Sequence, residues 1–138
     1  MEHTDLYAGL EALTTAECWD ELRRGQVGRL AVSIAGQPDI FPVNYAVDDE
    51  TIVIRTAPGT KLAAAILGRG VAFEIDELDP EARLGWSVVV KGEATELRDL
   101  DEIVAAGDLG IETWAEGDRQ RFLRIVPSSV TGRRIPPH

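Results

Sequence analysis

Four side chains that can bind phosphate lie close together in the middle of the sequence. An extended stretch ends in Arg55 and Thr56, and after a short Ala-Pro-Gly loop Thr60 and Lys61 open a segment rich in alanine and leucine. The first N–H groups of a helix lack intrahelical partners and favour an anion. Arginine adds a planar fork, lysine a compact charge and threonine a hydroxyl donor. The spacing is that of a phosphate site, although an ordinary loop with an exposed arginine, a capping threonine and a solvated lysine has the same pattern.

Two better-known nucleotide motifs are missing at this loop. A Walker A motif needs a glycine at position 54 and a serine or threonine after the lysine, whereas the chain has Ile54 and Leu62 there. The glycines of 68–70 do not extend to G-x-G-x-x-G, because position 73 is Phe73. Neither nucleotide hydrolysis nor Rossmann-type dinucleotide binding is therefore indicated.

The scarce residue types exclude several other classes of chemistry. The only histidines are His3 and His138, at the ends of the sequence, and the only cysteine is Cys18. A Ser-His-Asp triad, a histidine metal site or a histidine-ligated haem would have to recruit a terminal residue. A single cysteine rules out an intrachain disulfide and a cysteine zinc cluster, and we interpret Cys18 as buried packing. Difficult chemistry would then have to come from a bound organic cofactor.

Length and charge limit the class of protein further. The chain has 138 residues, which fit one domain over 1–138, with a mobile arm expected over 1–12. Its net charge of −10 repels the phosphates of a nucleic acid, so no nucleic-acid partner is expected. No apolar run approaches the roughly 20 residues of a transmembrane helix, and no signal-peptide pattern opens the sequence. We expect a cytoplasmic protein without a membrane partner.

Alternating apolar and polar residues predict a mainly β fold with short helices. Strands are expected over 27–34, 40–47, 51–56, 71–76, 86–97 and 122–126. Helices are expected over 61–68, over 99–109, and from a capping box of Thr14 and Glu17 to a stop at Gly25. Closely spaced strands joined by short turns favour an antiparallel barrel over alternating βαβ units.

Glycine and proline mark the irregular places in this pattern. Pro42 cannot donate to a β-ladder, so its strand should lie at an edge or carry a bulge. Gly92 predicts a bend or bulge in the longest strand. A charged loop is expected over 77–84, and an irregular tail from Pro127 onward.

Six stretches together resemble a known family. They are VGRLAV (27–32), PVNY (42–45), IRTAPGTKL (54–62), VAFEID (71–76), GWSVVVKGEA (85–94) and LRIVPSSVTGRR (123–134). In order and spacing they are similar to the FMN-binding split-barrel family typified by pyridoxamine 5'-phosphate oxidase. The resemblance implies a six-stranded antiparallel split β-barrel and a homodimer that shares FMN between its subunits.

The same resemblance assigns candidate cofactor residues. The phosphate would be held by Arg55, Thr56, Thr60 and Lys61; the isoalloxazine ring would run along Pro42, Val43 and Asn44; the other subunit would contribute Trp86 and Ser87. Asn44 has an alternative role as an ordinary polar strand residue, and Trp86 as a core residue. Trp114 would border the substrate face or anchor the dimer.

The chain also departs from the oxidase that gives the family its name. That enzyme is longer, and its C-terminal end carries an Arg-x-His element, whereas this chain ends in GRRIPPH. Oxidation of pyridoxamine phosphate is therefore not assigned, and we interpret Arg133 and Arg134 as solvated charges.

The resemblance favours an FMN-dependent oxidoreductase that acts on an unidentified small molecule with NAD(P)H as donor. Catalytic residues are not assigned, since no side chain looks like an obligatory acid or base. Three alternatives stay open: a reductase that uses the deazaflavin F420, a non-catalytic flavin-binding carrier or sensor, and a barrel that has lost its cofactor. The last would be colourless and would not be stabilised by FMN.

Overall fold

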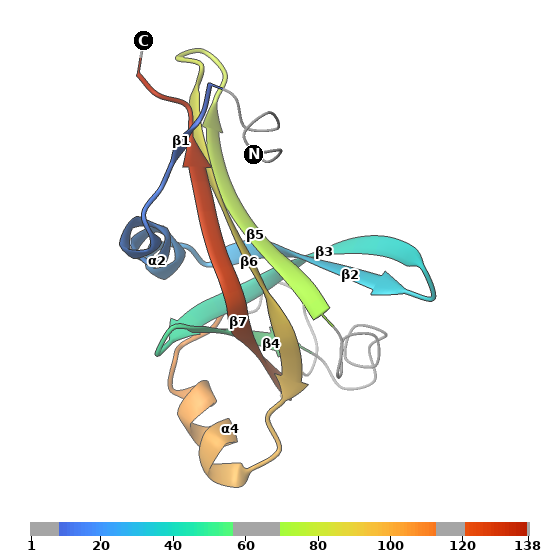
Figure 1. The fold of residues 1–138 in the computed structure, drawn as a ribbon. Helices are drawn as coiled ribbons and strands as arrows, with labels where there is room; N and C mark the ends of the chain where they lie inside the picture. The colour runs from blue at the N-terminus through green and yellow to red at the C-terminus, as the bar shows by residue number, and fades with distance from the viewer. Residues whose placement is uncertain (1–8, 57–69, 113–120, 138) are drawn as a thin grey trace.

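The computed structural model describes residues 9–56, 70–112 and 121–137, and in these it is mainly β with two short helices (Figure 1). The predicted helix over 61–68, with Thr60 and Lys61, lies outside the described residues, as does Trp114. The described strands form one antiparallel sheet of seven, so the predicted fold class is confirmed.

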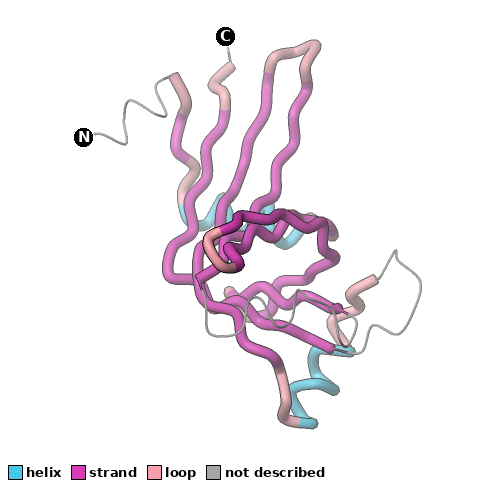
Figure 2. Tube along the Cα trace, turned by 90° about the vertical axis from the view of Figure 1, so that its right-hand side faces the viewer, coloured by secondary structure: helices cyan, strands magenta, loops and turns pink. Residues whose placement is uncertain are grey.

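The elements, in chain order, are β1 (Glu11–Ala12), α2 (Thr15–Arg24), β2 (Val27–Ile34), β3 (Gln37–Asp48), β4 (Thr51–Thr56), β5 (Gly70–Asp79), β6 (Leu84–Glu96), α4 (Leu100–Gly107) and β7 (Arg121–Arg134). The strand order is β1-β7-β4-β3-β2-β5-β6, and β6 also pairs with β7. That last pairing closes six strands into a barrel, while the remote halves of β5, β6 and β7 continue beyond it as an arm (Figures 1 and 2).

The seventh strand, β1, falls within the range expected as a mobile arm. Glu11 and Ala12 pair with Arg134 and Arg133 at the far end of β7. The residues of 1–8 lie outside the described part of the chain. No alternating pattern in so short a segment could have predicted this pairing.

Two strands, β5 and β7, are longer than the sequence pattern predicted. β7 continues through Pro127 and Gly132 to Arg134, where an irregular tail was expected. β5 and β6 likewise pair at 77–79 and at Leu84, so the loop predicted over 77–84 is reduced to a turn at 80–83. The predicted tail was wrong and the predicted loop too long for the same reason, because breaker or charged residues were given more weight than cross-strand pairing.

A bulge explains how Pro127 fits into a continuous strand. Lys91 pairs with Ser129 but Gly92 pairs with Pro127, so Ser128 has no opposite residue. A Cβ at Gly92 would collide with the carbonyl oxygen of Val126. The predicted irregularity at Gly92 is thus confirmed, and it lies where the proline cannot donate to the ladder.

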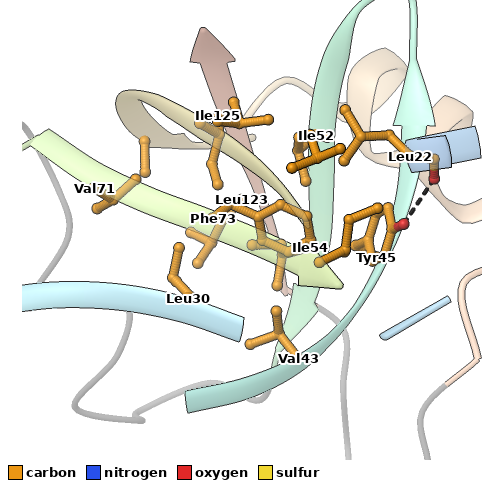
Figure 3. Close-up of a cluster of buried hydrophobic side chains, with 14 of the residues drawn as sticks. Leu22, Leu30, Val43, Tyr45, Ile52, Ile54, Val71, Phe73, Leu123 and Ile125 are labelled. Carbon is orange, nitrogen blue, oxygen red and sulfur yellow. Dashed lines mark hydrogen bonds between the residues drawn. The ribbon is translucent and has the colours of Figure 1, made fainter. Parts of the chain in front are cut away.

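The barrel encloses one main apolar core. Its largest fully buried side chains are Phe73, Leu22, Leu30, Ile52, Ile54, Leu123 and Ile125. Tyr45 stands edge-on to Phe73 at 4.8 Å between ring centroids, and its hydroxyl donates to the Leu22 carbonyl at 2.7 Å (Figure 3). This hydrogen bond ties helix α2 to the barrel wall.

Helix α2 closes one end of this core, as its sequence predicted. Thr14 and Glu17 form the expected capping box, with N–H to oxygen distances of 2.8 and 3.1 Å. Cys18 and Leu22 are fully buried on the inner face of the helix. The prediction that Cys18 is buried packing is therefore confirmed.

Candidate functional site

The predicted phosphate and ring residues meet where the β3–β4 ladder ends. The last pair of that ladder is Tyr45 with Ile54, so Asn44 and Arg55 follow directly at the same end. Asn44 pairs on its other side with Val27 of β2. The register therefore brings two of the predicted site residues to one corner of the barrel.

Arg55 is held on the outer side of β4 by two contacts. Its NH1 donates to the Ile111 carbonyl at 3.3 Å, and its guanidinium carbon lies 5.5 Å from the ring centroid of Phe122. Phe122 is also its partner on β7. These two contacts orient the guanidinium on the outer side of the strand.

The neighbouring polar residues are also partly withdrawn from water. Thr56 is only 6% exposed, and it is the sole buried polar residue of the described core. Asn44 is half-buried, and Asn44, Arg55 and Thr56 each have further interaction partners in the structure. Asn44 and Arg55 place an amide and a guanidinium on one face, and these groups match the polar atoms of a heterocyclic ring and a phosphate. Thr56 follows Arg55 directly in β4, so its buried hydroxyl lies toward the other face at the strand end.

A small hollow of about 320 Å³ lies beside this corner. Its lining includes Tyr45, Ala46 and the backbone around Ile111, whose carbonyl accepts from Arg55. A larger hollow, about 780 Å³, contains none of the predicted site residues; it is lined by 31–33, 70–72, 91–93 and 126–128. The predicted site residues therefore do not coincide with this larger hollow.

Strand alternation separates the other predicted ring contacts. Pro42 and Asn44 project to the outer face, whereas Val43 is 9% exposed and belongs to the core. Val43 can therefore offer a ligand mainly its backbone. β3 lies between β4 and β2 in the sheet, so the strand as a whole is not an edge strand. Pro42 pairs with Arg29 of β2, and β4 pairs only with residues 45–48 of β3, so the part of the strand that carries Pro42 has the predicted edge character.

Trp86 and Ser87 are consecutive in β6 and therefore face opposite sides of the sheet. Ser87 pairs with Asp76 and Arg133 on the outer face. Trp86 packs against the core and lines a hollow of about 640 Å³ with α2 and the chain end around Ile135. One surface of a ligand cannot meet both side chains in the same way, and their shared role as contacts from a second subunit stays a prediction.

The two arginines near the C-terminal end are tied to neighbouring groups. Arg134 pairs with Glu11 at 3.2 Å and Glu17 at 3.5 Å, although 44% of its side chain is exposed. Arg133 donates to the Gly132 carbonyl at 2.9 Å and has further partners. Arg134 thus links β7 to β1 and α2 in addition to being a charge at the surface.

The sequence analysis missed a charged cluster on the same outer face. Arg29 NH1 donates to Glu74 Oε1 at 3.0 Å and to Asp76 Oδ2 at 3.1 Å. Desolvation, together with the hydrogen bond and charge of Asp76, raises the pKa of Glu74 to about 7, against the opposing effect of Arg29. Two acidic residues spaced by two in a strand were the available signal, but their partner lies 45 residues away in the chain.

Two other kinds of site find no support in the described residues. Over 9–56, 70–112 and 121–137, no group of three or more His, Cys, Asp or Glu side chains is arranged to hold a metal ion. None of the helices in these ranges is long and apolar enough to cross a membrane.

Comparison with known proteins agrees with the fold. Residues 14–134 match the pyridoxamine 5'-phosphate oxidase family, to which the chain therefore belongs. The uncharacterized protein Rv0080 of Mycobacterium tuberculosis is 38% identical over 113 residues, which cover 78% of this chain and 74% of that protein.

Two solved structures are similar over nearly the whole chain. The FAD binding protein from Mycobacterium smegmatis is 35% identical, with a TM-score of 0.78 over 89% of this chain and 96% of that one. A FAD-binding protein from Mesorhizobium loti is 32% identical, with a TM-score of 0.77 over 91% of this chain and 97% of that one.

Proposed function

We propose that this protein binds a flavin nucleotide at the corner formed by Asn44 and Arg55. The observation that carries the proposal is their shared position at the end of the β3–β4 ladder, beside the buried hydroxyl of Thr56. The isoalloxazine ring would lie along Pro42, Val43 and Asn44, and the first phosphate at Arg55 and Thr56, with Thr60 and Lys61 completing its site. The flavin-binding descriptions of two relatives support this proposal.

FMN is the flavin that we propose, and FAD is the natural competitor because both relatives are described as binding FAD. The two molecules share the ring and the phosphate next to the ribityl chain. The corner described here addresses only that shared part. A comparison of the two affinities decides between them.

We further propose that the protein is an oxidoreductase for a small molecule, with NAD(P)H as electron donor. A bound flavin supplies the hydride chemistry. The chain would contribute the phosphate site, the amide of Asn44 at the polar ring edge, and an apolar wall that excludes water. Reduction of the bound flavin by NADH or NADPH would support this activity, whereas a flavin that neither donor reduces would favour a carrier, a sensor or an F420-dependent enzyme.

A second copy of the chain is part of the proposal. The outer face that carries Pro42, Asn44 and Ser87 is continuous across β3, β2, β5 and β6, and a flavin lying on it would leave one ring face uncovered. A homodimer would cover that face, with Trp86 or Ser87 of the partner subunit as contacts. Light scattering after size exclusion, with and without FMN, measures whether the dimer forms.

The site is tested by titrating FMN into the wild-type protein and two variants, with flavin fluorescence as the readout. Arg55→Ala combined with Lys61→Ala should lower FMN affinity at least about 100-fold, since two charge-assisted contacts are lost. Arg98→Ala is the matched control, because Arg98 is 76% exposed and pairs only loosely with Glu96 at 3.7 Å. Equal FMN affinity in the double variant and the control would overturn the proposed site.

A further inference from the structure

The charged cluster of Arg29, Glu74 and Asp76 spans two neighbouring strands. Glu74 and Asp76 project from the same face of β5, and both accept from NH1 of Arg29, at 3.0 and 3.1 Å. The Nε and NH2 groups of Arg29 make no hydrogen bond with the residues that the structure describes, and 56% of its side chain is exposed. The two carboxylates accept from one nitrogen of the guanidinium and leave its other donors without a bond to them.

The strand register places this cluster next to the candidate flavin site. Arg29 pairs with Pro42 across β2–β3 and with Glu74 across β2–β5. Val27, two residues earlier on the same face, pairs with Asn44. Because neighbouring strands lie about 4.8 Å apart, Arg29 is one strand, and Glu74 two strands, away from the proposed ring contacts.

The charge of the cluster changes near neutral pH. Desolvation is the largest cause that raises the pKa of Glu74 to about 7, followed by the hydrogen bond and charge of Asp76. When Glu74 is protonated, the net charge of Arg29, Glu74 and Asp76 together is zero. When Glu74 is ionised, their net charge is −1. The cluster thus exchanges one proton beside the ring site in the pH range where most enzymes work.

Few other charged residues face Glu74 and Asp76. Its partners on β6 are Val89, opposite Glu74, and Ser87, opposite Asp76, and the nearest charge on that strand is Lys91, opposite Ala72. From α2, Glu21 and Arg24 share a hollow with Asp76, but they pair with each other at 3.0 Å. Arg29 is therefore the dominant cation acting on the two carboxylates among the described residues.

We propose that Arg29 is an additional flavin-binding residue, an inference that rests on the flavin site proposed above. Glu74 and Asp76 would orient its guanidinium so that it donates to the carbonyl oxygens at the edge of the isoalloxazine ring. A guanidinium is planar, stays charged and presents paired donors, which suits a ring edge that carries several acceptors. The carboxylate pair keeps the arginine in place and sets the net charge that the ring meets. Glu74 and Asp76 are positioning residues, since they act through Arg29.

An exposed ion pair of purely structural character would look similar but behave differently. Such pairs contribute little to stability and nothing to ligand binding. Riboflavin separates the two roles, because it has the ring but no phosphate and so does not depend on Arg55. It also has no phosphate group whose titration would obscure that of Glu74.

The test measures riboflavin and FMN affinities for the wild-type protein, Arg29→Gln, Arg55→Ala and the control Arg98→Gln. Arg29→Gln should weaken both ligands by a similar factor, roughly tenfold, as expected for loss of a charged hydrogen bond. Arg55→Ala should weaken FMN while leaving riboflavin nearly unchanged. Unchanged riboflavin affinity in Arg29→Gln, together with weaker FMN binding in Arg55→Ala, overturns this inference and leaves the proposed function standing. A wild-type protein that binds neither ligand overturns both.

The role of the carboxylate pair has its own measurement. Riboflavin affinity of the wild type should fall as pH rises from 6 to 8, because ionised Glu74 adds a negative charge near the ring oxygens, and Glu74→Gln should abolish that dependence. The carbon-13 resonance of the Glu74 carboxyl should titrate at higher pH when riboflavin is bound, by linkage. Identical titration with and without riboflavin contradicts the role of the pair, and circular dichroism of each variant confirms that it is folded.

Discussion

Tyr45 and Ile54 form the last pair of the β3–β4 ladder, and the residues just beyond them, Asn44 and Arg55, are those proposed to hold the flavin. Both members of the pair are core residues, with Tyr45 3% exposed and Ile54 fully buried. The proposed corner therefore adjoins the buried core of the barrel directly. Five measurements test this account and the forces that maintain it.

The Tyr45 hydroxyl should contribute measurably to stability. It donates to the Leu22 carbonyl at 2.7 Å inside the core, and desolvation raises the pKa of Tyr45 to about 12. Tyr45→Phe removes this bond and should lower the free energy of unfolding by about 1 kcal/mol, measured by urea denaturation. The cost is moderate because the amide of Gly25 also reaches that carbonyl, at 3.4 Å. A more stable variant would contradict the importance given to this bond.

Because of the bulge in β7, substitution by alanine should affect stability differently at two glycines. Gly92→Ala forces a Cβ onto the backbone of Val126 and should destabilise the protein by about 1–3 kcal/mol. Gly107→Ala is the control, since a Cβ there meets nothing within 4 Å at the end of α4. Thermal melting of both variants tests the difference, and equal melting temperatures would show that the bulge tolerates a side chain.

The raised pKa of Glu74 predicts the sign of a pH effect on stability. Between its usual value of 4.5 and about 7, the folded protein binds more protons at Glu74 than the unfolded chain does. Stability should therefore fall as pH rises through this window and level off above it. Glu74→Gln should remove this contribution, whereas Glu81→Gln, in the β5–β6 turn, should not. Denaturation curves from pH 4.5 to 8 measure the slopes, and parallel slopes for the wild type and Glu74→Gln would refute the assignment.

Cys18 should be almost inert in the folded protein. It is fully buried, and desolvation, followed by the charge of Glu17, raises the pKa of its thiol. Its reaction with a thiol reagent should be slower by about 100-fold or more than in the urea-unfolded chain, since it requires an opening of the structure. Reaction at similar rates in both states would show that α2 does not seal the core.

Local patterns in the sequence were sufficient for most of the barrel but not for its pairings. The alternation in β2 to β5, the capping box at Thr14 and the irregularity at Gly92 are signals contained in a few neighbouring residues. The length of β7 is different, because Pro127 reads as a breaker until the bulge opposite Gly92 is known. That bulge depends on a strand more than thirty residues away, as its register shows.

The candidate site shows the same difference between local signals and cross-strand pairing. Arg55 came from the spacing of phosphate-binding residue types, Asn44 and Pro42 came from a family resemblance, and the register brings Asn44 and Arg55 to one corner. Arg29 was missed because nothing near it in sequence marks it as special; its importance comes from Glu74 and from Pro42, on two other strands. Such cross-strand clusters become visible only once the register is known.

The most direct test is a crystal structure of the protein grown with FMN. The account predicts phosphate oxygens within hydrogen-bond distance of Arg55 and Thr56, and a ring that lies along Pro42, Val43 and Asn44. Flavin density in the large hollow lined by 31–33, 70–72, 91–93 and 126–128, remote from Arg55, would contradict it.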